Sequence, residues 1–223
     1  MEDRMDAPTA LFREKTAAHL IKMFEKRRID ASYAPTAAQA KSEILAMIKG
    51  PATVLRCGSE SIGQLGLWAE IKALPGIDMI DPYQPGLTPE QGIALRLSGM
   101  SADFMLASSN AVTMDGKLVN LDGVCNRVAA MMFGPKKVIL LIGMNKIATD
   151  LEAAMARVRL VAAPINNLRL HAANPKHDTP CLADGRCHLC VSDDKICNAW
   201  TIIEGSRIKG RIHVKLCGED LGY

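Results

Sequence analysis

Hydrophobic residues recur along this chain with two periods, one typical of helices and one of strands. Apolar positions three and four residues apart predict helices in six segments, at about Pro8–Arg28, Thr36–Lys49, Ile62–Leu74, Pro89–Leu97, Asn126–Met132 and Asp150–Val161. Short apolar runs predict strands in six others, at Ala52–Cys57, Ile77–Ile80, Asp103–Ala107, Lys136–Gly143, Trp200–Glu204 and Arg211–Leu216. Because strands and helices alternate, the pattern predicts an α/β sheet with helices on both faces.

Local signals set several of the element boundaries. Thr36 and Thr88 are predicted N-caps, since a threonine hydroxyl accepts hydrogen bonds from the free N–H groups of a first helical turn. Pro164 is expected to interrupt the helix that starts at Asp150, with Asn166–Leu170 resuming it, because proline has no N–H group to donate.

The strand and turn signals in the middle of the chain are stronger. Lys136–Gly143 is a nearly continuous apolar run, which is typical of a strand that is covered on both faces. Asp115-Gly116 stands between two alternating segments and predicts a β-hairpin over Asn110–Asn120. We therefore expect a Rossmann-like sheet with a β-hairpin insertion.

Composition limits the class of protein. The chain has 223 residues, of which 48% are hydrophobic and 23% charged, so we expect one folded domain over residues 1–223 with an aliphatic core. A net charge of +3, without a basic patch carrying aromatic residues, argues against a nucleic-acid partner. The start Met1–Asp6 is charged and no apolar run is long enough to span a bilayer, so we expect no transmembrane segment and a cytoplasmic location.

Four cysteines form the feature that points most directly to a metal. They are spaced C-x5-C-x2-C-x6-C, at Cys181, Cys187, Cys190 and Cys197. Four thiolates on one short loop suit either a structural zinc ion or a [4Fe–4S] cluster, and spacing alone does not decide between them. The alternative is a set of free or disulfide-paired thiols. We therefore predict a cysteine-rich metal-binding loop over residues 178–198.

The remaining cysteines and the neighbouring histidines are not expected to be ligands. Cys57, Cys125 and Cys217 are separate in the sequence, and Cys57 has no identifiable base that would activate it as a nucleophile. His177 and His188 lie close to these cysteines, but single histidines in such a place are more often solvated or hydrogen-bonded than metal ligands.

Polar residues gather in two places that suit a ligand site at the edge of the sheet. The Gly58–Ser61 turn follows a strand and precedes a helix, an arrangement that directs backbone N–H groups at an anion. Amides, carboxylates and a guanidinium also crowd the hairpin region, although turn chemistry explains part of that pattern. The candidate ligand-binding residues are Gly58, Ser59, Glu60, Ser61, Asn110, Thr113, Asp115, Asn120, Asp122, Asn126, Arg127 and Lys146.

The second half of the chain carries a series of motifs in a fixed order. They are NAVTMDGKLVN from Asn110, DG from Asp122, NRVAA from Asn126, FGPKKV from Phe133, GMNK from Gly143, APIN from Ala163 and GEDLG from Gly218. The series closely resembles the LUD-domain (DUF162) family, the lactate-utilisation proteins, and the resemblance extends from about residue 10 to the end. One departure is Cys125, where the family pattern leads us to expect glycine.

The resemblance implies a fold similar to the sugar-phosphate isomerase and CoA-transferase superfamily. It also implies an association with the oxidation of lactate to pyruvate by a complex that contains iron–sulfur and oxidoreductase subunits. This association favours an iron–sulfur cluster over zinc in the cysteine loop. The leading hypothesis is therefore an accessory or electron-transfer component of organic-acid oxidation.

Two alternatives stay open at this point. One is a protein that binds a small anionic metabolite, or a transferase of CoA-transferase-like fold with a structural zinc ion, whose carboxylate would be Glu60 or Asp122. The other is a scaffold in which a metal only holds the C-terminal loop together. A fold that hosts many activities does not decide among them, so whether the protein is an enzyme stays open as well.

Overall fold

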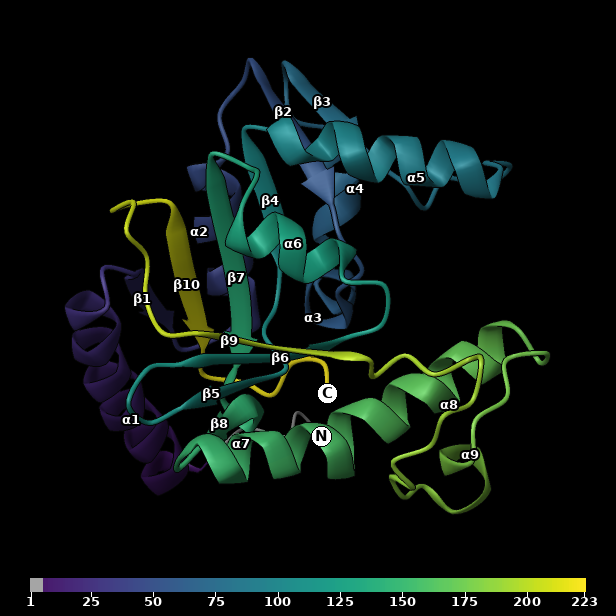
Figure 1. The fold of residues 1–223 in the computed structure, drawn as a ribbon. Helices are drawn as coiled ribbons and strands as arrows, with labels where there is room; N and C mark the ends of the chain where they lie inside the picture. The colour runs from purple at the N-terminus through teal and green to yellow at the C-terminus, as the bar shows by residue number, and fades with distance from the viewer. Residues whose placement is uncertain (1–5) are drawn as a thin grey trace.

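A parallel six-stranded sheet forms the centre of the computed structural model, which describes residues 6–223 (Figure 1). The strand order is β1-β10-β7-β4-β2-β3. The strands are β1 (Asp30–Ala34), β2 (Ala52–Arg56), β3 (Ile77–Ile80), β4 (Phe104–Ala107), β7 (Lys137–Gly143) and β10 (Ile212–Cys217). The predicted Rossmann-like α/β fold is confirmed. Most of the charged start used in predicting a cytoplasmic location, residues 1–5, lies outside the described residues.

Helices cover both faces of the central sheet. One face carries α2 (Ala37–Met47), α3 (Glu60–Gln64) and α4 (Leu67–Lys72), and the other carries α1 (Ala7–Lys26) and α6 (Asn126–Met132). Helix α5 (Pro89–Ser98) lies against β3 and leads into a 3-10 turn at Gly99–Ser101. No helix within residues 6–223 has both the length and the apolar character needed to cross a membrane.

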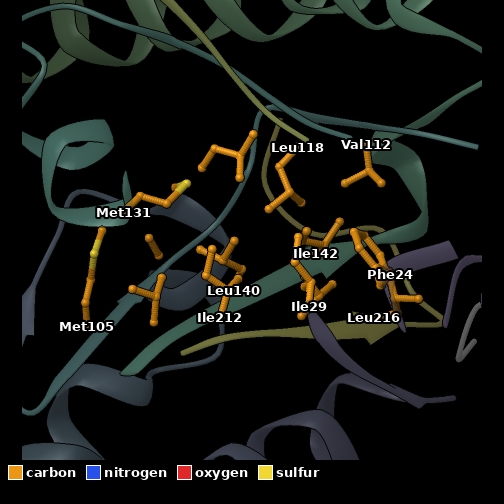
Figure 2. Close-up of a cluster of buried hydrophobic side chains, with 14 of the residues drawn as sticks. Phe24, Ile29, Met105, Val112, Leu118, Met131, Leu140, Ile142, Ile212 and Leu216 are labelled. Atoms are coloured by element: carbon orange, nitrogen blue, oxygen red, sulfur yellow. The ribbon is translucent and has the colours of Figure 1, made fainter. Parts of the chain in front are cut away.

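Strand β7 lies between two hydrophobic cores. Val138, Leu140 and Ile142 enter the core under α1 and α6, whereas Ile139 and Leu141 enter the core under α2, α3 and α4. Figure 2 shows Leu140 and Ile142 in the first of these cores, with Phe24 of α1 also part of the cluster. Since alternate residues of a strand point to opposite faces, a run that is apolar throughout is required here, as the sequence predicted.

A second sheet contains the predicted hairpin. Its order is β8-β5-β6-β9, with β8 (Ile147–Ala148), β5 (Ala111–Thr113), β6 (Leu118–Asp122) and β9 (Ala199–Ile203). Strands β5 and β6 pair antiparallel, and β6 pairs antiparallel with β9. One face of this sheet packs toward the central sheet and the other packs against α7 (Leu151–Arg157). The predicted insertion is thus a four-stranded layer.

Three local predictions differ from the structure. Strand β1 was not expected, because its sequence DASYA has no apolar run and only Ala34 is buried. The helix predicted over Ile62–Leu74 is two helices, separated at Gly66, whose φ is 66°. The predicted break at Pro164 is wrong, because a π-helical turn at Val158–Ala162 connects α7 to α8 (Ala163–Ala173) and accommodates the proline.

The cysteine loop follows α8. It contains one short helix, α9 (Cys181–Asp184), and otherwise irregular backbone up to β9. In Figure 1 the loop projects beside α8, away from the central sheet, and returns along the second sheet through β9.

Candidate functional site

A polar cavity of about 380 Å³ lies where β2, β4 and β7 end. Three segments that follow strands of the central sheet line it: Gly58–Ser61 after β2, Ser108–Asn110 after β4, and Lys146 in the 3-10 turn after β7. The end of β6, the start of α6 and one side of α8 complete the lining. The carboxyl ends of parallel strands are the usual ligand location in such sheets. We call this space the polar cavity. The predicted residues that line it are Gly58, Ser59, Glu60, Ser61, Asn110, Asp122, Asn126, Arg127 and Lys146.

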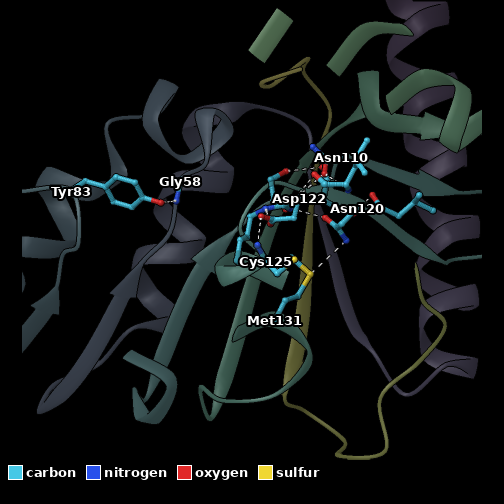
Figure 3. Close-up of polar contacts among 12 residues, drawn as sticks. Gly58, Tyr83, Asn110, Asn120, Asp122, Cys125 and Met131 are labelled. Carbon is cyan, nitrogen blue, oxygen red and sulfur yellow. Dashed lines mark hydrogen bonds and ion pairs between the residues drawn. The ribbon is translucent and has the colours of Figure 1, made fainter. Parts of the chain in front are cut away.

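Arg127 organises one wall of the polar cavity. Its guanidinium donates to Asp122 Oδ2 at 3.1 Å, to Asn120 Oδ1 at 2.7 Å and to Asn110 Oδ1 at 2.9 Å. It also donates to the carbonyl oxygen of Ser108 at 2.9 Å. The labelled Asn110, Asn120 and Asp122 side chains converge in Figure 3. Since these internal partners occupy the guanidinium, Arg127 holds the wall in place.

Asp122 links this wall to the turn before α6. Its Oδ1 atom accepts from the backbone N–H of Cys125 at 3.1 Å, while Oδ2 accepts from Arg127. Cys125 has a φ of 66°, in the left-handed region that favours glycine. This conformation gives a physical reason for the glycine that the family pattern led us to expect at the position.

Three of the predicted ligand-binding residues do not line the polar cavity. Asn120 is completely buried beneath it, with its amide nitrogen 3.7 Å from Met131 Sδ. Thr113 ends β5 and Asp115 lies in the hairpin turn that follows it. The Thr113 hydroxyl bonds the Asp115 carboxylate, and Asp115 forms an ion pair with Arg27 at 2.8 Å. Turn chemistry accounts for both of these residues.

Lys146 is a buried amine on the cavity wall, with 4% of its surface exposed. Its Nζ atom lies 2.9 Å from Ser61 Oγ and 3.0 Å from Ser108 Oγ. Within residues 6–223 it forms no ion pair with a carboxylate. Desolvation, together with the positive charges of Arg157 and Arg127, lowers the pKa of Lys146 to about 7.

Several further lining residues were not expected from the sequence. Arg96 of α5 lies over the Tyr83 ring, 5.4 Å from its centroid, and the Tyr83 hydroxyl accepts from the Gly58 N–H at 2.9 Å (Figure 3). Arg169 of α8 bonds Asn166 Oδ1 at 2.8 Å and lies 3.4 Å from Glu60 Oε1. On a helix such residues resemble an ordinary solvated face, so no local signal identifies them.

The charges around the polar cavity favour an anion. Three arginines line it against two acidic side chains, Arg96, Arg127 and Arg169 against Glu60 and Asp122, and the amine of Lys146 is a further basic group. Asp122 is already paired with Arg127, and the Nε atom of Arg96 is buried without a hydrogen-bond partner. An excess of positive charge in a concave site raises the local concentration of anions.

All four loop cysteines line a second, much smaller cavity of about 10 Å³, which is room for about one water molecule. We call this the cysteine cavity; its other walls include Ala163, Pro164 and Asn167. The four thiols are unpaired. Across the described part of the chain, no three His, Cys, Asp or Glu side chains are grouped closely enough to hold a metal ion.

Polar groups contact two of the sulfur atoms. Thr179 Oγ1 lies 3.3 Å from Cys181 Sγ, and Arg159 donates to Cys187 Sγ at 3.8 Å. His177 Nε2 bonds Asn167 Oδ1 at 2.9 Å and His188 Nε2 bonds Asp184 at 3.0 Å, so both histidines have other partners.

The two cavities share a wall. Cys197 and Ala163 line both of them. The loop end is attached to the polar cavity by the backbone, because Asn198 N–H donates to the Asp122 carbonyl oxygen at 2.9 Å. A group bound at Cys197 would therefore lie next to a ligand in the polar cavity.

Comparison with known proteins identifies the family. No curated protein matches the chain. A DUF162 family protein from Deinococcus radiodurans, solved by crystallography, has the same fold, with a TM-score of 0.50 and 14% sequence identity over 92% of this chain and 96% of that one. The family model of the LUD domain matches residues 17–216. The family is associated with lactate utilisation, so the match supports a role related to that process. On the strength of a match that spans nearly all of its length, the chain belongs to the LUD-domain family.

Proposed function

We propose that this protein binds a small hydroxy acid in the polar cavity and acts as a component of its oxidation, with Cys181, Cys187, Cys190 and Cys197 holding an iron–sulfur cluster. The observation that carries the proposal is the shared wall, since Cys197 belongs to both cavities. An electron carrier has to lie close to the group that it oxidises or reduces, so this adjacency supports an electron-transfer role.

The ligand class follows from charge and size. The polar cavity holds about 380 Å³ and has an excess of cationic side chains, which suits a small carboxylate. Its lining also contains side-chain hydroxyl and amide groups, among them Ser61 and Asn166, which suit the hydroxyl of a hydroxy acid. Asp122 gives both carboxylate oxygens to internal partners, so it is not free to act as the carboxylate of a transferase.

The four loop cysteines have the right chemistry to bind a [4Fe–4S] cluster, but the loop has to move to make room for one. Four thiols from one loop face a single cavity, and a cluster takes four thiolates. The cysteine cavity is smaller than a cluster, so the loop must open. Residues 186–197 form no helix or strand, so this movement breaks no regular element.

A bound cluster would supply one-electron transfer. Oxidation of a hydroxy acid to an oxo acid releases two electrons and two protons, so a partner oxidoreductase subunit is needed to receive the electrons. The chain's own residues would orient the acid and exclude water. Within the described residues Arg96 forms no ion pair, and Arg169 lies 3.4 Å from its one ion partner, Glu60. These two arginines line the polar cavity and are the cations that we propose bind the acid.

Metal analysis of protein prepared without oxygen tests the cluster. We expect iron and sulfide in the wild-type protein, with a visible absorption band and an EPR signal on reduction. Cys187→Ser should lose most of the iron, and Cys125→Ser is the matched control that should keep it. Stoichiometric zinc without iron would exclude the electron-transfer role.

Ligand binding is tested separately by thermal shift with lactate, glycolate and acetate. A ligand that binds only the folded state raises the melting temperature. We expect hydroxy acids to stabilise the protein more than acetate, and Arg169→Met to reduce the shift at least threefold. Arg207→Met, at an exposed site outside the cavity, is the control. No shift with any of the acids would refute the ligand class.

A further inference from the structure

Lys146 differs from the other deeply buried lysine of the described chain. Lys215 has 3% of its surface exposed and is ion-paired with Glu43, which accounts for its charge. Lys146 is as deeply buried, yet its partners are the neutral hydroxyls of Ser61 and Ser108. An ammonium group has three N–H donors, so these two partners leave one donor unused on the wall of the polar cavity.

The charged groups around Lys146 do not compensate for a positive charge. Arg127 lines the same cavity and gives its guanidinium to Asp122 and three amide or carbonyl oxygens. Arg157 donates to the carbonyl oxygens of Asn145 and Asn110, at 2.8 and 2.7 Å. Burial of an ammonium near two other cations is costly, and the neutral amine avoids that cost.

A neutral lysine amine carries a lone pair and is a nucleophile toward carbonyl carbon. Desolvation and a neighbouring cation are the two ways in which proteins activate lysine for this chemistry. Both are present at Lys146, which also lines a cavity large enough for a small ligand.

We propose that Lys146 is a reactive amine that forms an imine with the carbonyl group of a small oxo acid bound in the polar cavity. The inference deepens the proposed function and rests on its ligand class, because an oxo acid is the product of hydroxy acid oxidation. It does not depend on the cluster.

The reaction balances without an oxidant or reductant. Nζ attacks the carbonyl carbon, a C–N bond forms, and the carbonyl oxygen takes a proton to give a carbinolamine. Loss of that hydroxyl as water, with the second amine proton, leaves the C=N bond. Ser61 Oγ and Ser108 Oγ, at 2.9 and 3.0 Å from Nζ, are placed to accept and return the protons. Addition of water reverses the reaction and frees the oxo acid.

Reductive trapping tests the proposal on the wild-type protein. The full chain is incubated with pyruvate and sodium cyanoborohydride, digested, and mapped by tandem mass spectrometry. We expect the reduced adduct on the Lys146 peptide at a level at least tenfold above any exposed lysine, such as Lys209. Lys215 is an internal control in the same digest and should stay unmodified. Lactate, which has no carbonyl to condense, should give no adduct.

The outcomes separate this proposal from the proposed function. Lys146→Arg removes the nucleophilic amine and should abolish the adduct at this site. An unmodified Lys146 in the wild-type protein, or labelling no greater than at Lys209, overturns the reactive amine whatever the variant does. If pyruvate then still raises the melting temperature, ligand binding stands and only the imine is refuted. If neither pyruvate nor the hydroxy acids raise the melting temperature, the proposed ligand class is refuted as well.

Discussion

The side-chain nitrogen of Lys146 lies 2.9 Å from the hydroxyl oxygen of Ser61, although 85 residues separate the two in the chain. Ser61 belongs to α3, which follows β2, and Lys146 belongs to the turn that follows β7. Strand β4 lies between these strands and supplies Ser108 from its own carboxyl end. The order of strands in the central sheet thus brings Lys146, Ser61 and Ser108 together on the wall of the polar cavity.

Replacement of Lys146 by methionine should stabilise the protein in a pH-dependent way. The pKa of Lys146 falls from 10.5 to about 7 on folding, so the unfolded chain binds more protons between these values. Stability therefore rises with pH across that window, and the cost of burying Lys146 is greatest below pH 7. We expect Lys146→Met to raise the free energy of unfolding by about 1–3 kcal/mol at pH 6.5.

Urea denaturation at pH 6.5 and pH 9.5 checks this prediction, because the gain should shrink at the higher pH. Lys215→Met is the control, since it removes the ion partner of Glu43 and should destabilise the protein. An equal gain at both pH values would show that Lys146 keeps its ordinary pKa.

Loss of Arg127 should destabilise the protein strongly. The Arg127–Asp122 pair is buried, with 13% and 8% of the side chains exposed. Arg127→Met removes the charged partner of Asp122 and one donor each from the amide oxygens of Asn110 and Asn120, which should cost about 3–5 kcal/mol. Chemical denaturation measures the loss. Arg207→Met, at an exposed position, should change stability by less than about 0.5 kcal/mol. A similarly small loss of stability for Arg127→Met would show that the hydrogen bonds of Arg127 do not hold the cavity wall in place.

A methyl group at Gly143 should disturb the polar cavity by displacing the C-terminal segment. The added Cβ would overlap the backbone nitrogen of Leu221 and lie 2.9 Å from the Glu219 carbonyl oxygen, so the C-terminal segment would have to shift. That segment includes Tyr223, which lines the polar cavity. We expect Gly143→Ala to cost about 1–3 kcal/mol and to weaken ligand-induced stabilisation.

The matched control for this change is Gly63→Ala in α3. A Cβ there meets nothing within 4 Å, and alanine is the better helix former, so stability should stay the same or rise by up to about 1 kcal/mol. Thermal and urea denaturation of both variants give the comparison. Equal effects of the two substitutions would argue against tight packing behind Gly143.

Buried and partly exposed cysteines should differ in their rate of alkylation. Burial raises the pKa of Cys57 to about 12 and that of Cys217 to about 11, so neither thiol should react in the folded protein. Cys187 and Cys190 are partly exposed and should be alkylated by iodoacetamide at pH 8 in metal-free protein. Mass spectrometry of digests taken over time measures the rates. Labelling of Cys57 as fast as Cys187 would contradict the burial, and a bound cluster should protect the loop cysteines.

Signals between residues close in the chain predicted much of the local structure. Thr36 and Thr88 both cap helices, accepting from the N–H groups of Gln39 and Gln91. Asp115-Gly116 forms the hairpin turn between β5 and β6. These features depend on the geometry of a few consecutive residues, so the sequence expresses them directly.

The pattern of hydrophobic residues also predicted which strands and strand ends are buried or polar. The apolar run of β7 predicted a strand covered on both faces, and the structure has it there. The ordered motifs from Asn110 onward indicated the family. Polar residues at strand ends indicated most of the lining of the polar cavity, because parallel strands direct their carboxyl ends to one edge.

The sequence by itself thus determined the caps, the hairpin, the buried strands, the family and the polar strand ends. Tertiary structure decided the rest: the pairing of β1 with β10 and of β9 with β6, and the helix that continues through Pro164. It also placed Arg96 and Arg169 on the cavity wall and brought Lys146 to Ser61 and Ser108. The physical reason is that these features depend on which distant segments bury each other. That choice is made by packing over the whole chain, and no short window of sequence contains it.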